Sequence, residues 1–265
     1  MYKSRLKICI LLLLYVCSGH LIEASGNIDA VMRSIVAISG RDGSGETVFA
    51  SAFLVETRSR NTVWLVSSAH SFNNIAEEYA RIDLRRCERN VYSPLPLQVR
   101  IREHGRAVYI SHAHLDLAAI KIELPAEADC CVFSRDFIAD ERYFDRLAIG
   151  AGTSVLIPGY PYGEACNEAG FAFARSGVIS SFPVRPASMH PVFHVDFEVF
   201  AGYSGAPVIF AGSGGAVMLG MVLEEVFLEE LRPQKGKKQL RTRRGLGLAR
   251  VLSAPLIGEF IAGLR

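Results

Sequence analysis

One short segment of the sequence combines the residue types that nucleophilic chemistry requires. Ser204 lies in the run Gly202-Tyr203-Ser204-Gly205-Ala206-Pro207. A serine hydroxyl is a weak nucleophile until a base takes its proton and fixed donors receive the resulting oxyanion. Glycines on both sides of the serine allow a tight turn that can direct two backbone N–H groups at one point beside the hydroxyl. We therefore expect an activated serine here; the alternative is an ordinary β-turn of the same composition.

Two residues earlier in the chain are the candidate partners of this serine. His70 ends the run Trp64-Leu65-Val66-Ser67-Ser68-Ala69-His70, where small residues permit close packing; a structural histidine is the alternative. Asp116 stands at the mouth of an apolar strand, where a carboxylate is costly to bury unless a partner such as an imidazole N–H holds it. No histidine follows His194, so the order Ser…Asp…His cannot be built around Ser204. The order His70…Asp116…Ser204 is available.

The three motifs resemble those of chymotrypsin-fold, trypsin-like serine peptidases, and of bacterial exported members in particular. They read V-S-S-A-H, D-L-A-A-I-K-I and G-Y-S-G-A-P, and the resemblance extends over residues 32–264. It implies two antiparallel six-stranded β-barrels with the site between them, protein or peptide substrates, and no cofactor. It also implies Ser204 as nucleophile, His70 as general base, Asp116 as the group that orients the imidazole, and the N–H groups of Gly202 and Ser204 as the oxyanion hole.

Departures from the family bear on activation and specificity. Tyr203 replaces the aspartate that pairs with a new N-terminus in digestive members, so we expect no activation by N-terminal insertion. Glu198, six residues before the nucleophile, takes the position at the floor of the primary specificity pocket. A buried acid there would favour Lys or Arg before the scissile bond. In the alternative, Val195, Phe197 and Val199 face inward and Glu198 is solvated.

The elements that must position these residues are short β segments between turn residues. Such regular spacing without long helices predicts an antiparallel barrel or sandwich, hence an all-β class. We expect a first barrel over about 32–123, a connector over about 124–147, a second barrel over about 147–250 and a terminal helix over about 255–264. The expected strands include Thr47–Val55, Thr62–Val66, Leu115–Ile122, Phe171–Arg175, Val178–Ser181, Val192–Phe200, Pro207–Phe210 and Ala216–Val222.

Composition and the first residues predict export. The 265 residues carry 29 Lys and Arg against 27 Asp and Glu, a net charge of +2 that argues against a nucleic-acid partner. Basic residues precede the apolar run Ile8–Val16, and Ala24-Ser25 is a plausible cleavage point. This is the order of a secretory signal peptide over residues 1–24, leaving 25–265 as the mature peptidase domain. The run is short for a bilayer span, although a retained anchor is the alternative, so we expect a secreted or periplasmic protein without stable membrane insertion.

The remaining cysteines and one basic segment leave their roles open. Four cysteines follow the leader: Cys87, Cys130, Cys131 and Cys166. One or two disulfides are permitted in an oxidising compartment, but the sequence fixes no connectivity. Residues 232–244 hold seven basic side chains. We interpret them as a solvated hairpin tip, with contact to an anionic surface or a self-cleavage site as alternatives. The sequence does not predict the oligomeric state.

Three other functions compete with the peptidase interpretation. A metal site could use His104, His112 and His114, because residues two apart in a strand share a face. A subtilisin-like order could use Asp42, His70 and Ser204, although the shortage of helices argues against it. The rival from another class is a catalytically inactive homologue, a secreted module that binds peptides in its cleft without cutting them.

Overall fold

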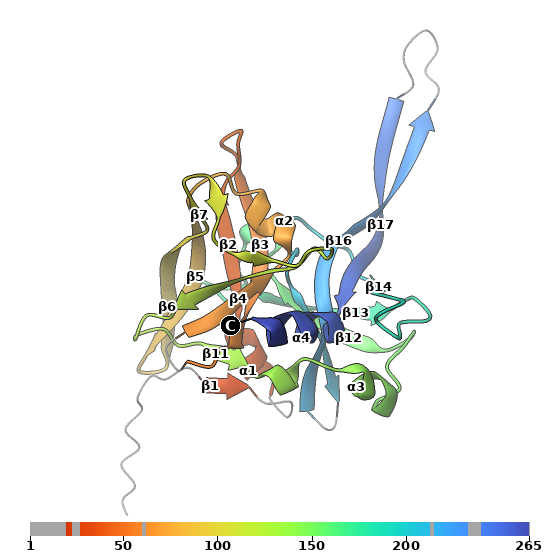
Figure 1. The fold of residues 1–265 in the computed structure, drawn as a ribbon, viewed down its shortest axis with the longest axis horizontal. Helices are drawn as coiled ribbons and strands as arrows, with labels where there is room; N and C mark the ends of the chain where they lie inside the picture. Colours follow the sequence, from red (N-terminus) through yellow and green to blue (C-terminus); the bar gives the residue numbers. More distant parts are fainter. Residues whose placement is uncertain (1–19, 23–26, 60–61, 213–214, 233–239, 265) are drawn as a thin grey trace, which may run out of the picture.

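Two β modules make up most of the chain, because β-branched and aromatic residues recur in short runs between turns. The computed structural model describes residues 20–22, 27–59, 62–212, 215–232 and 240–264. The modules lie beside each other, and the C-terminal helix α4 (Ala254–Gly263) crosses near their junction (Figure 1). The chain has the predicted all-β class, with the two modules arranged as a chymotrypsin-like double barrel.

The first module is a strongly curved sheet whose strands run in the order β6-β5-β2-β3-β4-β10-β9, with β1 and β11 attached beside β3. A small separate hairpin pairs β7 with β8. The strands are β1 (His20–Ile22), β2 (Ile35–Arg41), β3 (Thr47–Glu56), β4 (Thr62–Ser67), β5 (Tyr79–Glu88), β6 (Val91–Arg100), β7 (Arg102–Glu103), β8 (Arg106–Ala107), β9 (Ile110–Ser111), β10 (Ala118–Glu123) and β11 (Cys131–Phe133).

The second module is a closed barrel in the order β12-β13-β14-β17-β16-β15, the six strands that the resemblance implied. Its strands are β12 (Ser154–Gly159), β13 (Phe173–Ile179), β14 (Val192–Asp196), β15 (Pro207–Gly212), β16 (Gly215–Arg232) and β17 (Leu240–Ser253). The segments 171–175 and 178–181, expected as two strands, form the single strand β13. Gly177 within it marks a close approach, since a Cβ there would lie 2.9 Å from the carbonyl oxygen of Asp196.

Short helices fill the connections. They are α1 (Ile28–Arg33), α2 (Ala69–Asn73), η1 (Arg135–Phe137), α3 (Glu141–Arg146) and η2 (Pro161–Gly163). The terminal helix α4 begins one residue before the expected position and buries Ala254, Ile257 and Ile261 against the core. No helix among the described residues is long and apolar enough to cross a membrane.

The predicted leader falls almost entirely outside the described residues. Only residues 20–22 are described, as β1, which pairs in parallel with β11. The cleavage point after Ala24 lies outside the described ranges, and export stays a prediction. The basic segment 232–244 is divided in the same way, because β16 ends at Arg232, β17 begins at Leu240, and the tip between them is not described.

A buried arginine ties the two modules together. Arg85 on β5 is fully buried and donates hydrogen bonds to the Tyr160 hydroxyl (2.9 Å) and to the carbonyl oxygens of Gly170 (3.0 Å) and Ile35 (2.8 Å). Its guanidinium also lies over the ring of Phe171, 4.6 Å from the centroid. Tyr160, Gly170 and Phe171 belong to the second half of the chain, so this one side chain crosses the junction between the modules.

Candidate active site

His70 and Asp116 meet because of the strand pairing in the first module. Strands β4 and β10 are antiparallel with Ser67 opposite Ala118, so the residues after β4 and those before β10 lie at one end of the sheet. His70 Nδ1 lies 2.6 Å from Asp116 Oδ2, and the His70 backbone N–H donates to Asp116 Oδ1 at 2.9 Å. Both oxygens of one carboxylate thus hold one residue. This fixes the imidazole through Nδ1. The other ring nitrogen, Nε2, lies 3.5 Å from the Ser68 hydroxyl and is the one placed to exchange a proton.

The surroundings of Asp116 favour its charged form. Burial acts to raise the pKa of this carboxyl, but hydrogen bonds and charge from His70, with the backbone N–H groups of His70 and Ala69, lower it more, and the net shift is downward. The side chain is 35% exposed, so water screens part of this interaction. Asp116 is therefore an anion at neutral pH, as a group that orients an imidazole must be.

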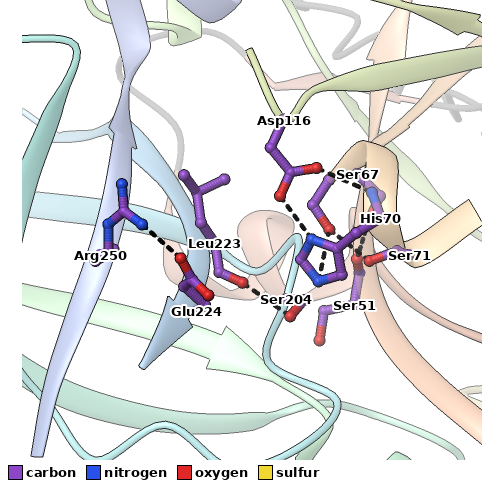
Figure 2. A network of polar contacts seen from close by, with 10 residues as sticks. Ser51, Ser67, His70, Ser71, Asp116, Ser204, Leu223, Glu224 and Arg250 are labelled. Carbon is purple, nitrogen blue, oxygen red and sulfur yellow. Dashed lines mark hydrogen bonds and ion pairs between the residues drawn. The ribbon is translucent and has the colours of Figure 1, made fainter. Parts of the chain in front are cut away.

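Ser204 lies on the loop between β14 and β15 of the second module, beside the imidazole (Figure 2). The turn before it closes through a hydrogen bond from the Tyr203 N–H to the Phe200 carbonyl oxygen at 3.1 Å. The Ser204 hydroxyl donates to the carbonyl oxygen of Leu223 at 2.9 Å. Among the described residues the structure gives no hydrogen bond between this hydroxyl and His70. The structure thus joins His70 and Asp116 by hydrogen bonds. It places Ser204 beside them with its hydroxyl directed at Leu223 and not at the imidazole.

The glycines of the loop are required by their surroundings. Gly202 has φ +98°, and a Cβ on it would lie 2.1 Å from the Tyr160 carbonyl oxygen. Gly205 has φ +87°, and a Cβ would lie 2.1 Å from the carbonyl oxygen of Ser51. Both conformations are ones that only glycine adopts at little cost. The loop consequently packs closer to its neighbours than any other residue would permit.

Two N–H groups of this loop are available to a ligand. The carbonyl oxygen of Ala201 accepts from the Tyr162 N–H, so the N–H of the same trans peptide, which belongs to Gly202, points the opposite way. Within the described part of the chain, the N–H groups of Gly202 and Ser204 donate to no other residue. Free donors at these two positions are what an oxyanion hole needs.

Ser51 is a site residue that the sequence analysis missed. It is fully buried in the middle of β3. Its Oγ donates to the Gly202 carbonyl oxygen at 2.7 Å and accepts from the Tyr160 N–H at 3.1 Å, and its N–H donates to the Ser204 carbonyl oxygen at 2.9 Å. The first module therefore holds the Gly202–Ser204 loop of the second. A hydroxyl at the centre of the apolar run Thr47–Val55 was the only signal in the sequence.

The sequence left two positions open for Glu198, a buried pocket floor and a solvated strand face. The structure shows the solvated one. Its side chain is exposed, while the neighbouring Phe197 is buried. Arg175 on β13 donates to the Glu198 carbonyl oxygen at 3.0 Å and lies over the rings of Phe197 and Tyr203, at 4.5 and 5.4 Å from the centroids. Burial raises the pKa of Tyr203 against the opposing effect of Arg175, so this tyrosine stays neutral. The groups packed beside this loop are therefore aromatic rings and a guanidinium, and not a buried acid.

The groups invoked by the rival functions have other roles in the structure. His112 Nδ1 accepts hydrogen bonds from the N–H groups of His114 (3.1 Å) and Leu115 (3.0 Å). In the described ranges no three His, Cys, Asp or Glu residues are arranged to hold a metal ion. Asp42 Oδ1 accepts from the N–H groups of Ser44 and Glu46 and closes a turn.

The four described cysteines are free thiols, with Cys130 and Cys131 buried.

Comparisons with known proteins give a likeness in structure only. No family model matches the chain, and no curated protein sequence matches it. A serine endoprotease from Yersinia pestis superposes with a TM-score of 0.50 at 14% sequence identity, over 89% of this chain and 64% of that one. This chain thus spans somewhat less than two thirds of the length of that relative. A thermostable serine protease from an extremophilic microorganism gives a TM-score of 0.45 at 12% identity, over 85% of this chain and 93% of the other.

These findings define the class of fold. The closed second barrel, the curved first sheet and the likeness to the Yersinia endoprotease show that the chain has the chymotrypsin-like serine peptidase fold. The site described above lies where the two modules of this fold meet.

Proposed function

We propose that this chain is an exported serine endopeptidase, with Ser204 as nucleophile, His70 as general base and Asp116 as its orienting carboxylate. The observation that carries the proposal is the bond of 2.6 Å between His70 Nδ1 and Asp116 Oδ2, beside a serine in a glycine turn with free N–H donors. Those donors, on Gly202 and Ser204, form the oxyanion hole. Residues 1–24 are the export signal, and the substrates are proteins or peptides.

The hydrogen bond of Ser204 to Leu223 suggests how substrate binding starts the reaction. A peptide whose N–H donates to the Leu223 carbonyl oxygen takes the acceptor that the hydroxyl now uses. The hydroxyl then turns to His70 Nε2 by rotation of one side-chain bond. Breaking one such hydrogen bond costs about 1 kcal/mol net, which a bound substrate readily offsets.

The chemistry that follows needs no group beyond these residues and water. Ser204 Oγ bonds to the substrate carbonyl carbon as its proton passes to His70 Nε2, and the oxyanion forms beside the N–H groups of Gly202 and Ser204. The C–N bond breaks when His70 returns the proton to the leaving amine. Water, activated by the same imidazole, then hydrolyses the acyl-enzyme and regenerates the serine. Asp116 stays ionised throughout and stabilises the imidazolium.

Labelling with a fluorophosphonate probe tests the proposal. The wild-type protein should be labelled at one serine and should cleave casein, whereas Ser204→Ala should lose both properties and unfold at the same temperature. Ser180→Ala, an exposed serine in the second module, is the matched control and should behave as wild type. Undiminished casein cleavage by Ser204→Ala would reject the assignment.

One observation favours a second candidate, the inactive peptide-binding homologue. The Ser204 hydroxyl is engaged by Leu223 and not by the base. A protein that keeps this bond when peptide is present would bind in the cleft without cutting. It would resist the probe yet bind peptides with equal affinity before and after the Ser204→Ala substitution, which separates it from the enzyme.

A further inference from the structure

The chain between β14 and Ser204, residues 197–203, is not held by strand pairing along its whole length. The pairing of β14 with β17 ends at Asp196. Among the described residues, the backbone groups of residues 198 and 199 make one hydrogen bond, which the Arg175 guanidinium donates to the Glu198 carbonyl oxygen at 3.0 Å. A side chain of the neighbouring strand β13 therefore holds a stretch that the sheet itself does not.

Three aromatic rings of loop 197–203 surround the guanidinium of Arg175. Its central carbon lies 4.5 Å from the ring centroid of Phe197, 4.9 Å from that of Phe200 and 5.4 Å from that of Tyr203. Phe197 and Tyr203 also meet edge to face, with their centroids 5.0 Å apart. A cation within about 6 Å of a ring centroid is attracted to the face of that ring. Arg175 thus contacts this loop at both of its ends.

The barrel fixes the direction in which Arg175 points. Alternate residues of a strand share a face, and Gly177 and Ile179 on the face of Arg175 are buried in the barrel. On the other side of the loop, Tyr203 is fully buried, and a Cβ on Gly159 of β12 would lie 2.6 Å from its ring. The ring that directly precedes Ser204 therefore lies against both β12 and the guanidinium.

Arg175 makes no ion pair with any carboxylate in the described part of the chain, and the side chain of Glu198 is exposed. Its partners are one carbonyl oxygen and three π faces, all of them in loop 197–203. A planar guanidinium can stack on rings and donate a hydrogen bond at the same time, which the ammonium group of lysine does less well. The contacts of this arginine are thus directed at the loop.

We propose that Arg175 is a positioning residue, which keeps loop 197–203 in the conformation where the N–H groups of Gly202 and Ser204 are free to receive an oxyanion. The proposal rests on the peptidase function proposed above. The Tyr203 N–H donates to the Phe200 carbonyl oxygen and so closes the turn that contains Gly202. A guanidinium that holds the rings of both residues holds this turn. Because the cation belongs to β13, the turn forms without a new N-terminus.

Kinetics of two Arg175 variants test the proposal. Arg175→Met removes the charge and the donor but keeps an unbranched side chain. We expect kcat to fall about thirtyfold with KM nearly unchanged, because misplaced oxyanion donors weaken the transition state and not the bound substrate. Affinity for a peptide aldehyde, whose adduct carries the oxyanion, should fall by the same factor. Arg175→Lys keeps a cation beside the rings and should recover part of both losses.

Arg146→Met is the matched control. The Arg146 guanidinium lies 4.1 Å from the ring centroid of Tyr143, in the same kind of contact but on α3 and outside loop 197–203. This variant should keep the wild-type kcat and aldehyde affinity. A wild-type kcat in Arg175→Met would overturn the proposal. So would an equal loss of kcat in Arg146→Met, or a loss in Arg175→Met that appears in KM alone, since either result would indicate a general effect on packing.

Hydrogen exchange separates this proposal from the peptidase assignment. In the Ser204→Ala protein, which needs no turnover, the amides of residues 197–206 should exchange at least about tenfold faster once Arg175→Met is added, and no faster with Arg146→Met. If the wild-type protein cuts no substrate but exchange in this segment still depends on Arg175, the peptidase function fails and the role of Arg175 stands. If the wild-type protein cuts peptides while neither kcat nor exchange responds to Arg175→Met, only the present proposal fails.

Discussion

Ser51 and Gly202 are joined across the two modules by a hydrogen bond of 2.7 Å from the serine hydroxyl to the glycine carbonyl oxygen. The same hydroxyl accepts from the Tyr160 N–H, so one buried atom holds the turn that carries the proposed oxyanion donors against a second backbone segment. Its bonds to this loop go to backbone groups and not to the Ser204 hydroxyl. In the proposed enzyme, Ser51 would therefore act through the position of the Gly202–Ser204 backbone.

Replacing Ser51 by alanine should therefore reduce catalysis more than folding. We expect kcat to fall about tenfold to a hundredfold with little change in KM, because the oxyanion donors act in the transition state. Affinity for a peptide aldehyde should fall in parallel, and Ser51→Thr should restore part of it. The measurement is steady-state kinetics beside thermal unfolding. Ser34→Ala is the matched control, since Ser34 is also fully buried with one hydroxyl bond, to the Ala30 carbonyl oxygen. An equal kcat loss in both variants would contradict a positioning role.

The close approach at Gly202 predicts a different kind of loss. Gly202→Ala would place a methyl group against the Tyr160 carbonyl oxygen, so the turn must open and its N–H donors must move. We expect kcat to fall at least ~100-fold, the effect of losing one oxyanion donor. Gly152→Ala separates this from backbone strain alone, because Gly152 has φ +90° with no atom within 4 Å of the added Cβ. The control should lose ~1 kcal/mol of stability and keep its activity. A Gly202→Ala enzyme as active as the control would refute the argument.

Asp116 predicts a dependence of stability on pH. Its pKa in the folded protein lies below the ordinary value of 3.8, so the unfolded chain binds the proton more readily. The resulting stabilisation is complete above that ordinary value and is lost as the pH falls through the folded pKa. In urea titrations, the stability advantage of the wild type over Asp116→Asn should shrink as the pH falls below about 4, through the folded pKa of Asp116. A difference that grows as the pH falls below about 4 would have the wrong sign.

The same variant also tests the role of Asp116 in catalysis. An amide at this position favours the wrong imidazole tautomer, and we expect kcat at neutral pH to fall by about 10⁴. Activity within tenfold of wild type would show that this carboxylate is not the orienting group.

Arg85 predicts where the junction between the modules is most sensitive. Arg85→Ala would remove the guanidinium donor from the Tyr160 hydroxyl and from the carbonyl oxygens of Gly170 and Ile35, and the single hydroxyl proton of Tyr160 can serve only one of these two carbonyls. We expect a cost of about 3 kcal/mol in the free energy of unfolding. Arg81→Ala on the same strand removes only an exposed ion pair to Asp83 and should cost less than about 1 kcal/mol. Chemical denaturation of both variants gives the comparison. Similar losses would mean that Arg85 contributes no more than a surface charge.

The strands were predictable from sequence where their apolar residues are continuous. Thr47–Val55 and Thr62–Val66 lie within β3 and β4 because both strands are buried along most of their length. β5 was missed because its buried residues alternate with arginines and an aspartate, although Ala80, Ile82 and Leu84 keep a period of two. β16 was predicted only over Ala216–Val222 and β17 was not predicted, because the charged residues beyond Leu223 indicate a loop when the pairing between the two strands is unknown.

The site was predictable only as far as residue types and chain order determine it. His70, Asp116 and Ser204 stand out as a base, a carboxylate and a nucleophile in a particular order. The rotamer of Ser204 and the exposure of Glu198 depend on packing, which the order of residues does not give. The contact of Ser51 could not be predicted for a related reason. Its partner Gly202 lies about 150 positions away, and the residues around Ser51 in the sequence do not indicate the contact.

The packing around Gly205 restricts how this chain can vary. A Cβ at this position would meet the Ser51 carbonyl oxygen and the Ser67 hydroxyl at 2.1 Å, and both serines belong to the other half of the chain. Ser67 Oγ also donates to the Ser51 carbonyl oxygen, so the two serines cannot be displaced separately. In evolution, Gly205, Ser51 and Ser67 should therefore change together or not at all. Substitutions in the two halves of the gene are coupled at these positions, although most other positions can vary independently.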